Sequence, residues 1–146
     1  MLDQIRNVLS DSDCIVRRCE DRGCCAHTDG LDTLVVKGEL VASGGQSAAD
    51  CIIFVRSGRA ITIVLVELKT RHVRVSSVLE KMANSEAWAK ALLKRVGQPP
   101  GAVVRAVFAR GGFPRVGTAE YVLLTKKGGI RLRRCGMRIC DLMTTV

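Results

Sequence analysis

A carboxylate and an ammonium group stand two residues apart at the end of a long apolar run. Residues 61–66 read ITIVLV, and Glu67, Leu68 and Lys69 follow them. Because side chains alternate along a strand, Glu67 and Lys69 share a face with alternate apolar residues of the run. Packing alone gives a buried strand no reason to end in this way. Two interpretations are open: a solvated strand end, or half of a site that performs chemistry.

A second carboxylate, Asp50, directly precedes the apolar run CIIFV at residues 51–55. The stretch RSGR that follows predicts a turn into the next strand. In a hairpin the start of one strand lies beside the end of the other, so we expect Asp50 and Glu67 to meet. Two carboxylates suit Mg²⁺ or Mn²⁺, with waters and a phosphate oxygen completing the shell. A metal there would activate water, and Lys69 would orient or deprotonate that water.

The pattern Asp50 … Glu67-Leu68-Lys69, followed by a helix and another strand, resembles the PD-(D/E)xK nuclease superfamily. That superfamily includes type II restriction enzymes and archaeal Holliday-junction resolvases. The resemblance covers residues 31–110 and implies a core of a helix, a three-strand meander, a helix and a strand. It also implies that Asp50 and Glu67 hold the metal and that Lys69 serves catalysis. The chain departs from the pattern at Ala49, where the superfamily has proline.

Many members of this superfamily carry a further acid. Glu20 and Glu39 are candidates for one on the first helix, and Glu86 is a candidate on the later helix. A helical wheel places Glu86 within the apolar stripe, where a carboxylate needs a partner. That partner is Lys69, the metal site, or an arginine of the C-terminal hairpin. Since E-x-K is a very common tripeptide, the solvated strand end remains the alternative.

Hydrophobic periodicity predicts the elements that position these residues. Apolar runs and alternation predict four strands, at 31–41, 51–55, 60–70 and 102–109. Helical spacing predicts a short helix at 2–9 and a long amphipathic helix at 75–96. The stretch KKGG predicts a turn between strands at 121–125 and 130–134. The result is an α/β (α+β) fold, with a mixed sheet of about four to six strands and a restriction-endonuclease-like core.

The 146 residues suit one domain. We divide it into an N-terminal helix and Cys-rich cap (1–30), a nuclease-like core (31–110) and a C-terminal hairpin (118–135). No apolar run approaches the ~20 residues of a membrane span. The start MLDQIRNVLS lacks the pattern of a signal peptide. We therefore expect a cytoplasmic protein that makes no membrane contact.

The chain carries a net charge of +9, from 23 Lys plus Arg against 14 Asp plus Glu. This excess favours a polyanionic partner, most simply DNA. The alternative is an arginine-rich surface of the kind found in thermophiles. The candidate nucleic-acid-binding residues are Arg71, Arg74, Lys126, Lys127, Arg131 and Arg133.

Seven cysteines are many for a cytoplasmic chain. Cys51 stands alone in a predicted strand, and the segment from Asp11 to Gly30 is predicted to be a loop or a loosely helical cap. The spacings match no ordinary zinc template. Disulfides or free thiols are the favoured interpretation, with zinc and an iron–sulfur cluster as alternatives. The candidate structural cysteines are Cys14, Cys19, Cys24, Cys25, Cys135 and Cys140.

Together these features predict a Mg²⁺- or Mn²⁺-dependent endonuclease or exonuclease that hydrolyses DNA phosphodiester bonds. One alternative is a catalytically inactive nucleic-acid-binding or assembly protein on the same scaffold. A second is a Cys-rich metal or redox protein. A small nuclease that cuts both strands usually works as a dimer, so a homodimer is a further expectation, although no dimer seam is recognisable.

Overall fold

The protein is described from a computed structural model, which covers residues 1–146 except 11, 43–45, 70–71 and 144–146. Six strands form the main sheet, in the order β1-β4-β5-β6-β7-β8. Their bounds are β1 Ile15–Val16, β4 Thr33–Lys37, β5 Cys51–Ser57, β6 Ala60–Lys69, β7 Pro100–Ala109 and β8 Ile130–Arg134. The neighbours from β1 to β6 pair antiparallel, whereas β6, β7 and β8 run parallel. The sheet is therefore mixed, as predicted.

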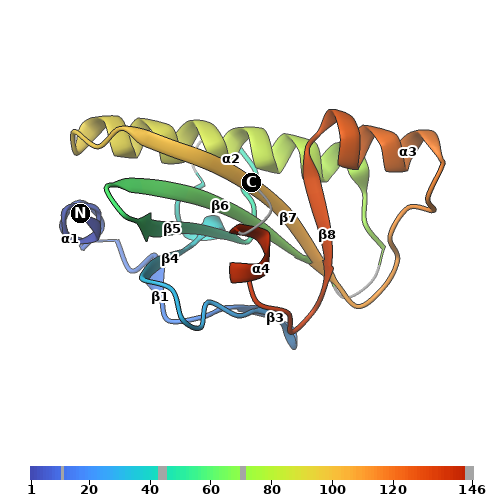
Figure 1. The fold of residues 1–146 in the computed structure, drawn as a ribbon, viewed down its shortest axis with the longest axis horizontal. Helices are drawn as coiled ribbons and strands as arrows, with labels where there is room; N and C mark the ends of the chain where they lie inside the picture. Colours follow the sequence, from blue (N-terminus) through green and yellow to red (C-terminus); the bar gives the residue numbers. More distant parts are fainter. Residues whose placement is uncertain (11, 43–45, 70–71, 144–146) are drawn as a thin grey trace.

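The long helix α2 (Val75–Arg95) connects β6 to β7 and lies along one face of the sheet (Figure 1). Its bounds confirm the helix predicted at 75–96, and α1 (Leu2–Leu9) matches the helix predicted at 2–9. The opposite face carries a two-stranded sheet and the short helix α4 (Cys140–Met143). The architecture is therefore a mixed α+β fold whose central strands are covered on both faces.

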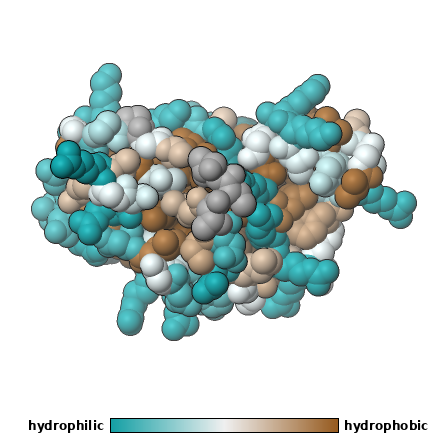
Figure 2. All heavy atoms as spheres, viewed as in Figure 1, coloured by the Kyte–Doolittle hydropathy of each residue, from teal (hydrophilic) through white to brown (hydrophobic). Residues whose placement is uncertain are grey.

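Hydrophilic side chains project around the outline of the molecule, with apolar atoms between them (Figure 2). No helix in the described part of the chain combines the length and the apolar character that a membrane crossing requires.

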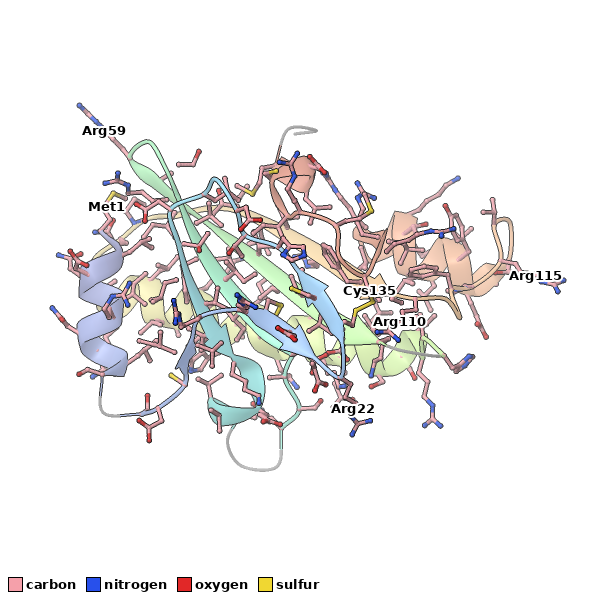
Figure 3. All side chains as sticks on the ribbon, turned by 90° about the horizontal axis from the view of Figure 1, so that it is seen from below. Met1, Arg22, Arg59, Arg110, Arg115 and Cys135 are labelled. Atoms are coloured by element: carbon pink, nitrogen blue, oxygen red, sulfur yellow. A yellow bond between two sulfur atoms is a disulfide. The ribbon has the colours of Figure 1, made fainter. Side chains whose placement is uncertain are left out.

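The Cys-rich segment forms strands, so the expectation of a loop or loosely helical cap was wrong. β2 (Cys19–Asp21) pairs antiparallel with β3 (Cys24–Ala26), and disulfides join Cys19 to Cys51 and Cys24 to Cys135. Figure 3 shows Cys135 in the second of these bonds. We call β2 and β3 the cap hairpin. Its two strands are stabilised by pairing with each other and by disulfides to distant cysteines. The local periodicity of the sequence reveals neither kind of contact.

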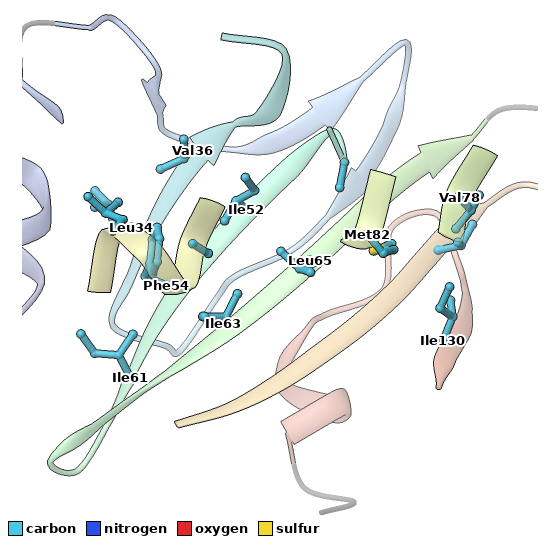
Figure 4. Packing of buried hydrophobic residues seen from close by; sticks show 14 of the residues in the cluster. Leu34, Val36, Ile52, Phe54, Ile61, Ile63, Leu65, Val78, Met82 and Ile130 are labelled. Atoms are coloured by element: carbon cyan, nitrogen blue, oxygen red, sulfur yellow. The ribbon is translucent and has the colours of Figure 1, made fainter. Parts of the chain in front are cut away.

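Strand β6 is buried on both faces. Ile61, Ile63 and Leu65 pack with Val78 and Met82 of α2 in one apolar cluster (Figure 4). The alternate residues Val64, Val66 and Leu68 pack on the other face with the cap hairpin. Burial on two faces explains why residues 61–68 form an unbroken buried run.

The C-terminal hairpin predicted at 118–135 is not formed. The segment predicted as its first strand is helical, with α3 (Ala119–Val122) followed by a π-helical turn, η2 (Leu123–Lys127). The Thr118 side chain caps α3 by accepting a hydrogen bond from the Tyr121 backbone N–H at 3.2 Å. β8 then pairs parallel with β7. A favourable N-cap thus outweighs the β propensity of the segment.

Candidate functional site

Asp50 and Glu67 meet at one end of the β5–β6 pair, as the hairpin argument predicts. The last pair in the register is Cys51 with Val66, which leaves Asp50 and Glu67 one position beyond it. The Asp50 backbone N–H donates to Glu67 Oε1 at 3.1 Å. In return, the Leu68 backbone N–H donates to Asp50 Oδ2 at 2.7 Å. Each carboxylate is therefore oriented by the backbone of the neighbouring strand.

Two lysines converge on the same oxygen of Glu67. Lys69 Nζ lies 3.3 Å from Glu67 Oε2, and Lys81 Nζ lies 2.7 Å from it. The Glu67 side chain is 0% exposed, while Lys69 and Lys81 are 28% and 21% exposed. The three predicted residues Asp50, Glu67 and Lys69 thus form one cluster, and Lys81 of α2 completes it.

Lys81 is a residue of the cluster that the sequence pattern did not predict. A usable signal was present, because Lys81 lies three residues after Val78 and four before Ser85, which are both buried. That spacing places Lys81 beside the face of α2 that meets the sheet.

Residues on the same face of α2 form hydrogen bonds with the segment that precedes Asp50. Ser85 Oγ accepts a hydrogen bond from the Ala49 backbone N–H at 2.8 Å, and Asn84 Nδ2 donates to the Ser47 carbonyl at 2.8 Å. Gly38 approaches so closely that a Cβ there would lie 1.6 Å from the Ala49 carbonyl oxygen. The position of Asp50 is therefore determined by packing as well as by strand pairing.

The two carboxyl groups have different proton affinities. Burial, a hydrogen bond to Glu67 and the negative charge of Glu67 together raise the pKa of Asp50 to about 7. Burial opposes ionisation of Glu67 too, but hydrogen bonds from Asp50 and Lys81 and the charges of both lysines outweigh it and lower the Glu67 pKa. The cluster is best described as an ionised Glu67 beside an Asp50 that titrates near neutral pH.

Burial also opposes the charge of Lys81, yet the hydrogen bond to Glu67 and the charges of Glu67 and Asp50 raise its pKa. Lys81 therefore stays protonated at neutral pH, and it serves as a fixed positive charge rather than as a base.

No protein-family model, curated protein or solved structure matches this chain.

The donor set of Asp50 and Glu67 fits a magnesium-type ion better than zinc. Mg²⁺ binds through one or two carboxylates and keeps several waters. Among the described residues, no group of three or more His, Cys, Asp or Glu side chains is arranged to hold a metal. A Mg²⁺ or Mn²⁺ ion on two carboxylates needs no such group, but it would compete with the protons and ammonium groups that these oxygens now contact.

Two of the further acid candidates lie near Asp50. Glu20 of the cap hairpin and Glu39 line the same small cavity as Asp50, with a volume of about 60 Å³. Glu39 pairs with Lys37 at 3.0 Å, and both are exposed. Neither acid contacts Glu67, so each stands at the border of the cluster rather than within it.

Glu86 lies elsewhere on α2. It pairs with Arg105 of β7 and with Lys90, whose Nζ lies 3.1 Å from Glu86 Oε2. Among the described residues, neither Lys69 nor an arginine of the C-terminal segment pairs with Glu86; its partners are Arg105 of β7 and Lys90 of α2. Glu86 is therefore a structural ion-pair residue.

The candidate nucleic-acid-binding residues differ in their exposure. Arg74, Lys126 and Lys127 are exposed. Arg131 and Arg133 are half-buried and donate to backbone carbonyl groups of Leu142 and Leu132, respectively. Arg71 lies outside the described residues.

Of the candidate structural cysteines, Cys19, Cys24 and Cys135 form disulfides, whereas Cys14, Cys25 and Cys140 are free thiols. Cys51, which the sequence analysis set apart, is the partner of Cys19. The Cys19–Cys51 bond attaches the cap hairpin to the residue that follows Asp50.

Proposed function

We propose that the chain is a metal-dependent nuclease that hydrolyses phosphodiester bonds of DNA. The observation that carries the proposal is the convergence of Asp50, Glu67 and Lys69 at the end of the β5–β6 pair. An antiparallel meander, a long helix and a parallel strand surround them, in the order that the resemblance to the PD-(D/E)xK superfamily implies.

In this mechanism Asp50 and Glu67 would hold a divalent metal through their carboxylate oxygens. When bound, Mg²⁺ or Mn²⁺ polarises the phosphate and lowers the pKa of the attacking water. Lys69, the more exposed of the two lysines, orients that water or stabilises charge on the phosphate. Lys81 keeps Glu67 ionised and fixed in direction, which makes Lys81 a positioning residue.

The net charge of +9 supports a polyanionic substrate. It attracts the phosphate backbone without selecting a sequence, so the acidic pair supplies the chemistry and the basic surface supplies affinity.

A second candidate is a DNA-binding protein that has no catalytic activity. One observation favours it: both oxygens of Glu67 are already satisfied, by the Asp50 backbone N–H and by two ammonium groups. Such a network is stable without any metal. The two candidates differ in whether a divalent ion displaces these contacts.

Nicking of supercoiled plasmid DNA in the presence of Mn²⁺ tests the proposal. We expect nicking by the wild-type protein and its loss in Glu67→Ala and in Lys69→Ala. Lys90→Ala is a matched control, because Lys90 lies on α2, is 48% exposed and pairs with Glu86. Activity that persists in Glu67→Ala would point to a contaminating nuclease. Tight DNA binding without cleavage, with Mg²⁺ or Mn²⁺, would favour the second candidate.

A further inference from the structure

A basic hollow separate from the carboxylate cluster lies between the cap hairpin and the end of β8. Its volume is about 460 Å³, and its lining includes His27, Arg110, Arg134 and Cys25. None of the described residues that line it is acidic. A hollow whose lining residues include two arginines and a histidine, and no acidic residue, suits an anion.

The walls of the hollow are held in place without a ligand. The Cys24–Cys135 disulfide joins β3 to the residue after β8. The Gly136 backbone N–H donates to the Cys25 carbonyl at 2.7 Å, and the His27 backbone N–H donates to the Met137 carbonyl at 3.0 Å. A binding site with fixed walls loses little entropy when it is filled.

The two arginines have different roles. Arg110 Nη2 donates to the Gly23 carbonyl at 3.0 Å, and a Cβ on Gly23 would lie 2.7 Å from that nitrogen. Glycine at position 23 therefore lets the guanidinium rest against the cap hairpin. Arg134 is exposed, and its side chain makes no hydrogen bond or ion pair with a described residue. Its guanidinium is thus available to a ligand.

The hollow lies at the end of the strands where Lys69 lies, because Lys69 and Arg134 both stand at the C-terminal ends of their strands. The register pairs Lys69 with Ala109, and Ala109 with Arg134. Cys135 Sγ also lies 3.8 Å from the Lys69 carbonyl oxygen. Two strand spacings separate the backbones of Lys69 and Arg134 by about 10 Å. That distance corresponds to about three nucleotides at the rise of 3.4 Å per nucleotide.

We propose that the basic hollow binds a backbone phosphate of the DNA strand, about three nucleotides along that strand from the phosphate at Lys69. The inference rests on the proposed DNA substrate, and it gives that substrate a path from Lys69 to Arg134. Arg134 and the imidazole of His27 contact the phosphate, while Arg110 anchors the wall and adds positive charge. The site reads no base sequence, because it contacts only the backbone.

The test is metal-free DNA binding, measured by fluorescence anisotropy of a labelled 20-base-pair duplex in EDTA. We expect Arg134→Ala to weaken binding about three- to tenfold and to reduce the slope of log K against log salt by about one. Arg134→Lys restores part of the affinity, because it retains the charge and loses the planar fork. Arg59→Ala is the matched control, since Arg59 is exposed and lies far from Arg110 (Figure 3).

A second readout does not require DNA. Titration with inorganic phosphate should shift the NMR signals of the His27 ring in the wild-type protein and shift them less in Arg134→Ala. Equal DNA affinities and salt slopes for Arg134→Ala and Arg59→Ala, or a wild-type protein that binds no duplex, would overturn the inference.

Failure of the phosphate-site inference and failure of the nuclease proposal give different experimental results. Plasmid cleavage with no effect of Arg134→Ala on binding overturns only the phosphate site. Weaker binding by Arg134→Ala, in a protein that cleaves no DNA, supports the phosphate site and contradicts the nuclease.

Discussion

Lys81 Nζ lies 2.7 Å from Glu67 Oε2, which joins helix α2 directly to the buried end of strand β6. The contact fixes an ionised carboxylate in a place where burial alone would favour its neutral form. It also makes the candidate site depend on how the helix docks, not only on the hairpin.

Replacement of Lys81 should therefore affect both stability and cleavage. Lys81→Met keeps much of the aliphatic stem but removes the ammonium group from Glu67. We expect the free energy of unfolding to fall by about 1–2 kcal/mol and nicking to fall at least about tenfold. Urea denaturation and the plasmid assay measure these changes. Lys90→Met on the same helix should change stability by less than about 0.5 kcal/mol, and equal effects of the two variants would contradict the role of Lys81.

Loss of the charge on Glu67 should be more costly than loss of the charge on Glu86. Glu67→Gln leaves Lys69 and Lys81 facing a neutral amide, and we expect destabilisation of about 2–3 kcal/mol. Glu86→Gln alters a more exposed ion pair and should cost about 0.5 kcal/mol. Chemical denaturation compares the two variants. Similar losses of unfolding free energy in both variants would mean that burial of Glu67 adds nothing to the cost of removing its charge.

The raised pKa of Asp50 predicts a stability that falls as the pH rises. Its pKa is about 7 in the folded protein, against an ordinary 3.8. Between these values the folded state binds more protons than the unfolded chain, so the free energy of unfolding decreases with increasing pH. The lowered pKa of Glu67 acts in the opposite direction, but only near and below its ordinary value of 4.5. The contribution of Asp50 is thus isolated between about pH 5 and 7.

The difference between wild-type protein and Asp50→Asn measures this contribution. Urea denaturation at pH 5, 6 and 7 should give a difference that changes by at most about 1.4 kcal/mol per pH unit, because Asn does not titrate. A difference that is constant across this window would show that Asp50 has an ordinary pKa.

Reduction should destabilise the fold strongly. The two disulfides close separations of 32 and 111 residues, which correspond to about 4 and 5 kcal/mol of unfolded-state entropy. We expect Cys24→Ser/Cys135→Ser to lower the melting temperature more than Cys19→Ser/Cys51→Ser. Cys140→Ser replaces a free thiol and should leave the melting temperature nearly unchanged. Melting curves with and without reductant check this order.

The meeting of Asp50 and Glu67 was predictable because two local rules determine it. Strand alternation sets the face, and the turn after β5 brings the two strand ends together. Lys81 was harder to place, because its direction depends on how α2 docks on the sheet. The buried residues Val78 and Ser85 carried that information, but only relative to a sheet whose position was unknown.

The Cys-rich segment and the C-terminal segment were predicted incorrectly for a different reason. β2 and β3 are short strands fixed by disulfides to residues far away in the chain. At 119–127, the cap at Thr118 and the docking of Leu124 in the core outweigh the strand propensity of Tyr121 and Val122. Single-sequence periodicity contains neither long-range cross-links nor tertiary docking.

The pairing of Cys19 with Cys51 and of Cys24 with Cys135 interleaves along the chain. A break anywhere between residues 19 and 135 always separates at least one cysteine from its partner. The two pieces therefore remain one covalent molecule after any single peptide bond in this span is hydrolysed. Within this span, a protease would have to cut twice, or a reductant would have to act, before a fragment could leave.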